Sequence, residues 1–291
     1  MTECAKETGA ILLDGRALAT TQFEVLAQQV RARLERGTPC PGLAILEIGE
    51  DPAARAYVRA IVRSGERIGL TTRRVRLDAQ VAPAALADAL DAMAADSSIA
   101  GIIVQYPVPA PLMSTVMAHL PPHKDVDGIL PLNAGLLLQG DPLALVPATP
   151  LGGMALLRHY SIALEGRHAV VVGRSTVVGK PMAQLLLQAN ATVTVCHTRT
   201  RNLPELTRQA DILAVAAGRA HLITAEMIKP GAVVIDFGVN FVDGKMEGDV
   251  DTAAVAAIAG AITPVPGGTG PMTNVMLMRN VLAAGERLAQ S

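Results

Sequence analysis

The chain has 291 residues, which is enough for one large domain or two ordinary ones. Half of the residues are hydrophobic but only 2% are aromatic, so the core must consist mainly of Ala, Val, Leu, Ile and Met. The formal net charge of −1 offers no electrostatic reason to expect a nucleic-acid partner or an anionic membrane surface.

Cysteine usage and hydropathy indicate the cellular compartment of the protein. Its three cysteines (Cys4, Cys40 and Cys196) are far apart and form no CxxC pair, which fits a reducing compartment. The stretch MTECAKETGA has no apolar signal core, and prolines interrupt the two long uncharged stretches, 97–122 and 252–278. We therefore expect a soluble, cytoplasmic protein without a membrane partner. The six histidines lack metal-ligand spacing, so no metal is expected.

Predicted helices and strands alternate along the first half of the chain. Segment 17–37 predicts an amphipathic helix ended by Gly37, and segment 41–49 predicts a buried strand. The next helix has Asp51 as N-cap, Pro52 at its first position and Gly69 as terminator. A strand (71–77), a helix (82–96) and a short buried strand that runs into prolines (99–109) follow.

The second half repeats this alternation with short runs rich in valine. They read HAVVVG (168–173), ATVTVCH (191–197), DILAVAAG (211–218) and GAVVIDFG (231–238), with a helix from about Val177 after the first. Such runs are typical of parallel strands that are covered on both faces. The Pro/Gly-rich segment 142–153 marks the first crossing between domains, and an amphipathic helix (274–290) ends the chain. Two α/β domains are predicted.

The segment GRSTVVGKP (Gly173–Pro181) follows the first of these strands directly. A strand that ends in a glycine turn and opens into a helix is typical of phosphate binding, because the helix N-terminus favours anions. The spacing departs from GxGxxG: Ser175 and Val178 stand where glycines are usual, and Gly179 comes one place late. A turn without a ligand remains the alternative interpretation.

The end of the next strand indicates which dinucleotide would bind. An NAD site normally has an acidic residue here for the ribose 2′-hydroxyl. This chain has CHTRTR instead, with Thr198, Arg199 and Arg201 available for a 2′-phosphate, and Arg174 lies in the preceding loop. NADP is therefore favoured over NAD. Arg199 and Arg201 are equally compatible with a solvated surface, whereas Arg174 is the stronger candidate.

Several unusual stretches occur in one order along the chain. They are YVRAIVRSGERIG, IVQYPVP, HKDVDGILPLNAG, PATPLGG, GRSTVVGKP, ATVTVCHTRT and TPVPGGTGPMT. From about Leu13 to the last helix, the chain resembles the bifunctional methylenetetrahydrofolate dehydrogenase/cyclohydrolase family. The resemblance implies an α/β fold of two domains: an N-terminal α/β folate-binding and catalytic domain (1–148 plus 272–291) and a Rossmann-type, doubly wound NADP domain (149–271).

The resemblance also implies a function. It is the NADP-dependent oxidation of 5,10-methylenetetrahydrofolate to 5,10-methenyltetrahydrofolate in one-carbon metabolism. Tetrahydrofolate derivatives would bind in a cleft between the domains, and the Rossmann domains would pair into a homodimer.

The site residues follow from the matched motifs. For the cofactor they are Gly173, Arg174 and Ser175, with Thr198 near the 2′-phosphate and Val239 near the nicotinamide. For catalysis and substrate binding they are Tyr57, Val104, Gln105, Tyr106, Asp127, Pro266, Gly267, Gly268, Thr269 and Gly270. Tyr57 would stack on the pterin and Asp127 would bind its nitrogens. Taken alone, Tyr57 is also compatible with helix packing, and Asp127 with a turn before Gly128.

The chain departs from the family pattern at one catalytic position. Members with both activities carry a lysine four residues after the tyrosine, and this chain has Ile61 there. The nearby Arg59 and Arg63 point away from the Tyr57 face of a helix. Three further departures are Ala54 for a usual serine, Tyr106 for leucine and Thr269 for valine. With Ile61, these residues are expected to border one pocket.

The missing lysine predicts which activity is reduced. Hydride transfer needs positioning more than proton transfer by the protein, whereas opening the methenyl ring needs water and moving protons. Cyclohydrolase activity is therefore predicted to be weak or absent, with Tyr106 as a poor substitute for the lysine because a phenol has a pKa near 10. The alternatives are a fully bifunctional enzyme, a related enzyme for another pterin or one-carbon substrate, and a non-catalytic protein that binds NADP or folate.

Overall fold

The computed structural model describes residues 9–289, so Cys4 lies outside the described residues. The chain divides into two compact units. The six-stranded unit comprises the residues up to Leu18 and Thr149–Thr273, and the three-stranded unit comprises Ala19–Ala148 and the residues from Asn274 onward. No helix in the described part of the chain is long and apolar enough to cross a membrane.

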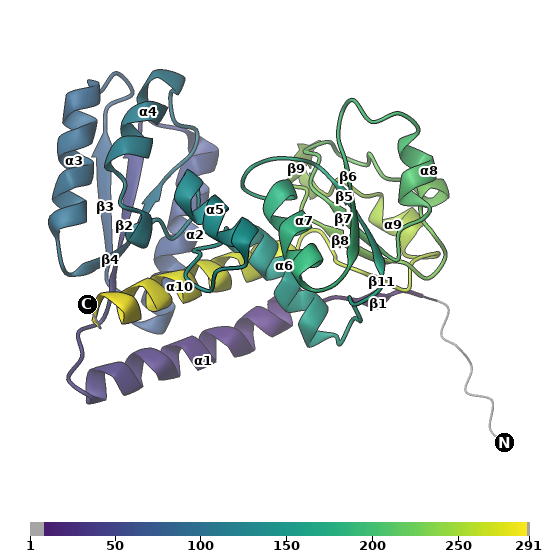
Figure 1. Cartoon of the computed structure of the whole chain (residues 1–291), viewed down its shortest axis with the longest axis horizontal. Coiled ribbons are helices and arrows are strands. Elements are labelled where there is room, and N and C mark those ends of the chain that lie inside the picture. Colours follow the sequence, from purple (N-terminus) through teal and green to yellow (C-terminus); the bar gives the residue numbers. More distant parts are fainter. Residues whose placement is uncertain (1–8, 290–291) are drawn as a thin grey trace. The chain divides into compact units, whose positions relative to one another are not determined.

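The six-stranded unit is built on a parallel sheet with the order β1-β11-β8-β7-β5-β6 (Figure 1). The valine-rich runs form β5 (His168–Val172), β6 (Thr192–Cys196), β7 (Ile212–Val215) and β8 (Val233–Asp236), as predicted. The chain passes from β5 to β6 on one side and then to β7 on the other. The carboxyl end of β5 is therefore the topological switch point, where open α/β sheets bind their ligands.

The first strand, β1, belongs to a different unit from the one that the sequence predicted for it. The sequence expectation assigned every residue before 149 to the substrate domain, but β1 (Ile11–Leu12) pairs in parallel with β11 (Ala261–Ile262). Backbone N–H groups of Ile11 and Leu13 donate to the carbonyls of Gly260 and Ile262, both over 2.9 Å. These bonds extend the six-stranded sheet by one edge strand, which explains why the segment leaves the other unit.

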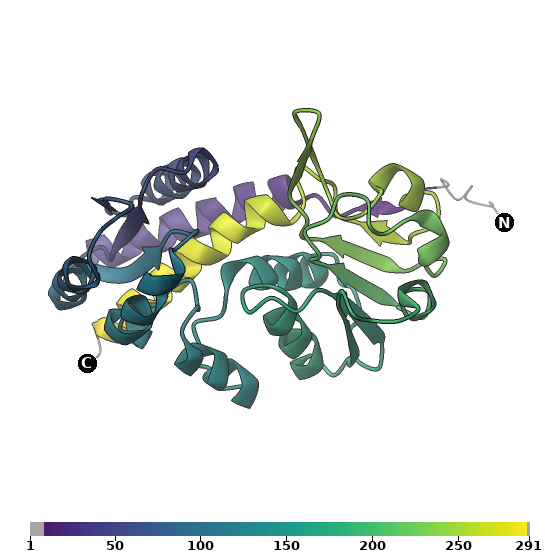
Figure 2. The same cartoon turned by 90° about the horizontal axis from the view of Figure 1, so that it is seen from above.

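Helices cover this sheet. They are α6 (Ala148–His159), α7 (Gly179–Gln188), α8 (Leu203–Thr207) and α9 (Thr252–Val255). Alternate residues of β5 and β7, such as Val170, Val172 and Leu213, join one buried cluster with residues of the segments around α8 and α9. A hairpin of β9 (Asn240–Val242) and β10 (Lys245–Glu247) projects from this unit (Figure 2).

The three-stranded unit has a parallel sheet with the order β3-β2-β4. Its strands are β2 (Gly42–Ile48), β3 (Thr72–Leu77) and β4 (Ile99–Val104). Its helices are α2 (Pro52–Ile68), α3 (Pro83–Ala95), α4 (Ala110–His119), α5 (Pro131–Gln139), and most of α1 (Gly15–Glu35) and α10 (Thr269–Leu288). Leucines and valines of α3 and α4 pack with β2 and β4 into one core.

Local signals in α2 and α10 explain how these helices are held. The Asp51 carboxylate accepts the N–H of Ala54 over 2.7 Å, and Gly69 ends α2 in the left-handed region with φ 86°, as predicted. The Asn280 amide on α10 donates to the carbonyls of Val126 and Val146, both over 2.8 Å. Most of the last helix therefore belongs to the three-stranded unit.

Candidate active site and cofactor site

The glycine turn after β5 is closely packed. A Cβ on Gly173 would collide with the carbonyl oxygen of Ala216, and one on Gly179 would collide with the backbone of Gly173. Gly179 thus allows the first turn of α7 to approach the end of β5, which is the role of the third glycine in GxGxxG. The late position of this glycine is explained because α7 itself begins at Gly179.

Ser175 orders the start of α7. Its Oγ accepts the N–H groups of Val178 and Gly179 over 3.2 and 3.3 Å. Two donors of the helix N-terminus are therefore occupied, and the hydroxyl hydrogen of Ser175 stays available to a ligand. Arg174 is exposed, and its guanidinium has no protein partner within residues 9–289.

A hollow of about 500 Å³ lies at the carboxyl ends of β5, β6 and β7. Val172, Gly173, Arg174 and Ser175 line it from the β5 side, and the other lining residues come from the segments around β6 and β7: His197, Thr198, Thr200, Leu203, Ala216, Ala217, Arg219 and Leu222. Two arginines and several hydroxyls face this space and no carboxylate lines it, which fits a phosphorylated dinucleotide.

The basic residues that the sequence offered differ in whether they line this hollow. Arg174 and Thr198 line it as expected, whereas Arg199 and Arg201 do not. In the turn after β6, the His197 N–H donates to Thr200 Oγ1 over 2.8 Å and the Arg199 N–H donates to His197 Nδ1 over 3.1 Å. His197 also lines the hollow, and Thr200 and Arg219 are lining residues that the sequence did not single out.

A second hollow of about 220 Å³ in the same unit brings two expected site segments together. Val239, expected near the nicotinamide, lines it together with the loop Pro266–Gly270, expected on the substrate side. Thr269 is nearly buried, and its Oγ1 donates to the Asp236 carbonyl over 2.9 Å, so its hydroxyl is used within the protein. Arg16 and Met246 also line this hollow, although no sequence motif indicated them.

In the three-stranded unit, Asp127 stands in the segment that runs beside β4. Ile102 of β4 forms a parallel bridge with Asp125, and Gly128 closes the turn with φ 65°. The Asp125 carboxylate accepts the N–H groups of Ile129 and Leu130 over 3.1 and 2.9 Å, so it has a structural role at the start of α5. The half-buried Asp127 carboxylate has no hydrogen bond to any residue of the described chain.

Two tyrosines share the electrostatic environment of Asp127. Burial and then the charge of Asp125 raise the pKa of Asp127 to about 6. Burial, followed by the negative charge of Asp127, raises the pKa of Tyr57 and that of Tyr106 above the usual value. Tyr57 and Tyr106 keep 37% and 41% of their surfaces exposed, so both rings are accessible to a ligand. Two of the expected residues, Tyr57 and Tyr106, thus share the environment of the Asp127 carboxylate.

Gln105 and Tyr106 follow β4 directly. The Gln105 amide nitrogen donates to the Tyr106 carbonyl over 2.7 Å, while its Oε1 is buried without a partner among the described residues. Such an orphaned acceptor favours a ligand donor in this position. The side chain of Val104 is only 1% exposed and packs in the core, so it is not available for the expected contact with substrate.

Three of the four departures from the family pattern, Ala54, Ile61 and Tyr106, lie in the three-stranded unit. Ala54 and Tyr106 line a small hollow at the end of β2 and β4 together with Glu47, which the sequence had not indicated. Ile61 is fully buried, as are Val58 and Ile68 of the same helix α2. Thr269 belongs to the six-stranded unit.

The ammonium group that Ile61 lacks is not supplied by the neighbouring KDVDG segment. Lys124 is the single lysine in the sequence of the three-stranded unit. Its Nζ donates to the carbonyls of Ala94 and Asp96 over 2.7 and 2.8 Å, and to Met93 over 3.4 Å, at the end of α3. Lys124 is 3% exposed and is held by these carbonyls, and burial lowers its pKa.

A parallel, doubly wound sheet with a basic, acid-free hollow at its switch point and a glycine turn opening into a helix defines an NADP-binding oxidoreductase. Comparison with known proteins narrows this class. The catalytic-domain model of tetrahydrofolate dehydrogenase/cyclohydrolase matches residues 13–127, and its NAD(P)-binding-domain model matches residues 147–289. The chain belongs to the tetrahydrofolate dehydrogenase/cyclohydrolase family.

Individual relatives agree with this assignment. The chain is 54% identical over 278 residues to the bifunctional protein FolD of Chloroflexus aurantiacus, an alignment that covers 94% of this chain and 97% of the relative. The structure resembles bifunctional FolD of Campylobacter jejuni, with a TM-score of 0.90, 38% identity and coverage of 96% and 99%. It also resembles the Trypanosoma brucei dehydrogenase-cyclohydrolase complexed with NADP and inhibitor, with a TM-score of 0.92, 33% identity and coverage of 97% and 99%.

Proposed function

We propose that this chain oxidises 5,10-methylenetetrahydrofolate to 5,10-methenyltetrahydrofolate with NADP, and hydrolyses the methenyl product weakly or not at all. The observation that carries the second part is the state of two side chains. Ile61 is fully buried at the position of the family's lysine, and Lys124 is bound by three backbone carbonyls. The unit therefore lacks a free lysine ammonium for ring opening.

NADP accepts the hydride when it is bound, and the chain's residues hold it in place. Gly173 and Ser175 would contact the phosphates at the start of α7, while Arg174 and Thr198 would bind the 2′-phosphate. Val239 would lie at the nicotinamide end, beside the loop Pro266–Gly270. Because Val239 and this loop line one hollow, they support hydride transfer between substrate and cofactor at this point.

On the substrate side, the ring of Tyr57 would stack on the pterin and the Asp127 carboxylate would accept its N–H groups. Gln105 would direct its buried, unpaired Oε1 to another substrate donor. These contacts position the methylene carbon for hydride loss, and the cation that forms is shared between the two flanking nitrogens. Positioning of this kind requires no proton transfer by the protein.

A second candidate is the fully bifunctional enzyme, and the relatives favour it. The curated relatives that match over nearly the whole chain are named bifunctional, which supports retained cyclohydrolase activity. In this chain, ring opening would then depend on groups other than a lysine at position 61. Asp127 and the hydroxyl of Tyr106 are candidates for moving protons in ring opening, because the charge of Asp127 acts on the pKa of Tyr106.

One assay separates these candidates. Purified protein is mixed with methylenetetrahydrofolate and NADP, and the absorbances of NADPH and methenyltetrahydrofolate are followed separately. NADPH formation with accumulating methenyl product, hydrolysed no faster than in buffer, supports the monofunctional dehydrogenase. Rapid enzyme-dependent loss of the methenyl product establishes the bifunctional enzyme. No NADPH formation favours another pterin substrate or a binding protein, which folate and NADP titrations distinguish.

We also propose a homodimer in the cytoplasm. Two exposed apolar side chains of the six-stranded unit support self-association: Val195 on the edge strand β6 is 42% exposed, and Phe241 on the hairpin is 70% exposed. The free thiols of Cys40 and Cys196 are consistent with a reducing compartment. Light scattering coupled to size-exclusion chromatography tests the dimer, and a monomeric mass at micromolar concentration would contradict it.

A further inference from the structure

The turn Ala217–Arg219, directly after β7, is held by one buried carboxylate. Asp249 Oδ2 accepts the N–H groups of Ala217 and Gly218 over 2.6 and 2.8 Å. Its Oδ1 accepts the Arg219 N–H and the Asn240 side-chain amide, both over 2.9 Å. Asp249 is fully buried, so its four hydrogen bonds are protected from water and fix the backbone of the turn.

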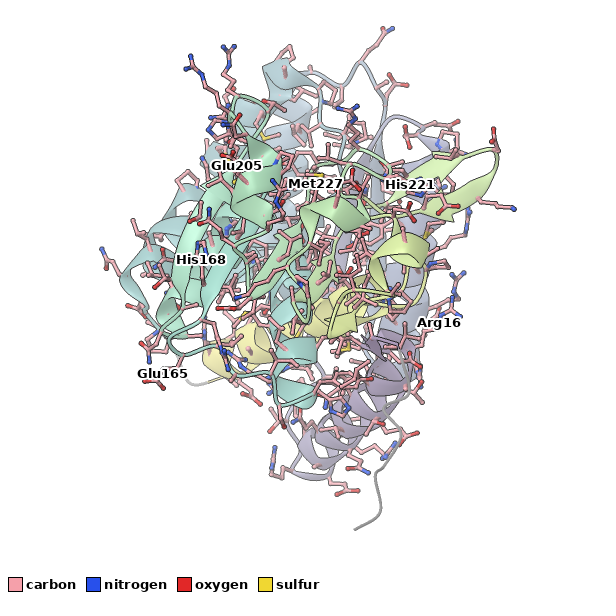
Figure 3. All side chains as sticks on the ribbon, turned by 90° about the vertical axis from the view of Figure 1, so that its right-hand side faces the viewer. Arg16, Glu165, His168, Glu205, His221 and Met227 are labelled. Atoms are coloured by element: carbon pink, nitrogen blue, oxygen red, sulfur yellow. The ribbon has the colours of Figure 1, made fainter. Side chains whose placement is uncertain are left out.

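Asp249 is itself anchored to the end of β8. The Asp236 carboxylate accepts the N–H groups of Asp249 and Val250 over 3.1 and 3.0 Å. A Cβ on Gly248 would collide with the Asp236 carboxylate, so the close approach requires glycine there. The chain after the turn adds a backbone bond, because the His221 N–H donates to the Gly248 carbonyl over 3.2 Å. Figure 3 labels His221, the second residue after the turn. The turn is therefore built into the sheet, unlike a free surface loop.

Arg219, the last residue of this turn, lines the cofactor hollow from the β7 side. Its side chain is exposed and forms no hydrogen bond or ion pair with any residue from 9 to 289. Arg174 and Thr198 line the same hollow from the β5 and β6 sides, whereas Val239 lines the second hollow with Pro266–Gly270. Arg219 therefore stands with the residues expected at the 2′-phosphate and away from the nicotinamide end.

We propose that Arg219 binds the adenosine half of NADP, and that Asp249 is a positioning residue that holds the turn presenting Arg219. The proposal rests on NADP as the cofactor. An unpaired guanidinium in a hollow without carboxylates can bind a phosphate oxygen or stack on the adenine ring, and both contacts belong to the adenosine half. The free-energy cost of burying the Asp249 carboxylate is lower when both of its oxygens accept hydrogen bonds, and the turn supplies three of the four N–H donors.

The binding role is tested by calorimetric titration of the full chain with NADP and with adenosine 2′,5′-bisphosphate, which carries the adenosine half alone. Arg219→Ala is expected to raise Kd for both ligands by about tenfold or more, as for a lost charge-assisted contact. Arg219→Lys should recover part of this loss if phosphate is bound, and none if adenine is stacked. Arg158→Ala, which removes an exposed arginine of α6 in the same unit, is the matched control.

The positioning role is tested with Asp249→Asn, because an amide removes one acceptor oxygen and directs N–H groups at the turn. Its KM for NADP and its Kd for adenosine 2′,5′-bisphosphate should rise, while kcat at saturating NADP changes much less. Asp243→Asn, at the exposed tip of the hairpin, is the control for charge. A thermal melt checks that the variants are folded.

Each outcome decides a part of the proposal. Native affinity of Arg219→Ala for both ligands would overturn the binding role. Native affinity in a folded Asp249→Asn, or failure of that variant to fold while Arg219→Ala binds normally, would overturn the positioning role. If the native chain binds neither ligand, both this proposal and NADP as the cofactor are rejected. If the native chain binds NADP but does not oxidise methylenetetrahydrofolate, only the proposed reaction is rejected.

Discussion

Substituting lysine for Ile61 tests the argument about ring opening. Ile61 is fully buried on α2, one turn after Tyr57, of which 37% is exposed. A long side chain on a helix leans toward the N-terminal turn, so a lysine at this position extends toward Tyr57. Its ammonium would thereby approach the ring whose pKa responds to burial and to the charge of Asp127.

The expected gain follows from the chemistry of the step. A positioned acid–base group raises the rate of such a step by about 10²–10⁴-fold, which corresponds to lowering the activation free energy by about 2.7–5.4 kcal/mol. We expect Ile61→Lys to raise the cyclohydrolase rate toward this range while the dehydrogenase rate changes much less. The variant should also lose stability by roughly 1–3 kcal/mol, the cost of an incompletely satisfied buried polar group, because the native side chain is 0% exposed.

The assay adds methenyltetrahydrofolate directly and follows its loss, with NADPH formation measured in parallel. Ile61→Met is the matched control, since methionine, like lysine, has a long unbranched side chain but carries no charge. A folded Ile61→Lys that oxidises the methylene substrate but hydrolyses the methenyl product no faster than Ile61→Met would refute the ammonium argument. Rapid hydrolysis by the native chain would refute it as well and establish the bifunctional enzyme.

Three further predictions concern single side chains. Burial and Asp125 raise the pKa of Asp127 to about 6, and protonation removes an acceptor, so kcat/KM for the folate substrate should fall as the pH is lowered through about 6. A pH profile checks this, and Asp127→Asn should abolish that inflection. Lys124→Met leaves carbonyls at the end of α3 unpaired, and should lower the free energy of unfolding by roughly 1–3 kcal/mol in a denaturant titration; unchanged stability would contradict the structural role. Arg174→Ala should raise Kd for NADP by about 10- to 100-fold with little effect on NAD, and equal losses for both dinucleotides would exclude a 2′-phosphate contact.

Much of the fold was predictable because its signals are local. The N-cap Asp51 and the terminator Gly69 set the ends of α2 through bonds within a few residues. Valine-rich runs predicted the parallel strands because a strand covered on both faces has no polar side. The pairing of β1 with β11 was missed, since a strand of two residues carries no periodic signal and its partner is about 250 residues away.

The sequence by itself determined the family, the preference for NADP and the absence of the lysine, because these depend on which residues occur in a motif. Only the tertiary structure decided which basic groups are free to act. Lys124 and Arg219 look alike as cations in the sequence, yet Lys124 is enclosed by the carbonyls of α3 while Arg219 faces the cofactor hollow. Asp249 carries no motif at all, and its function arises from the meeting of segments that are about thirty residues apart. A side chain's partners depend on the packing of distant segments, which local sequence does not encode.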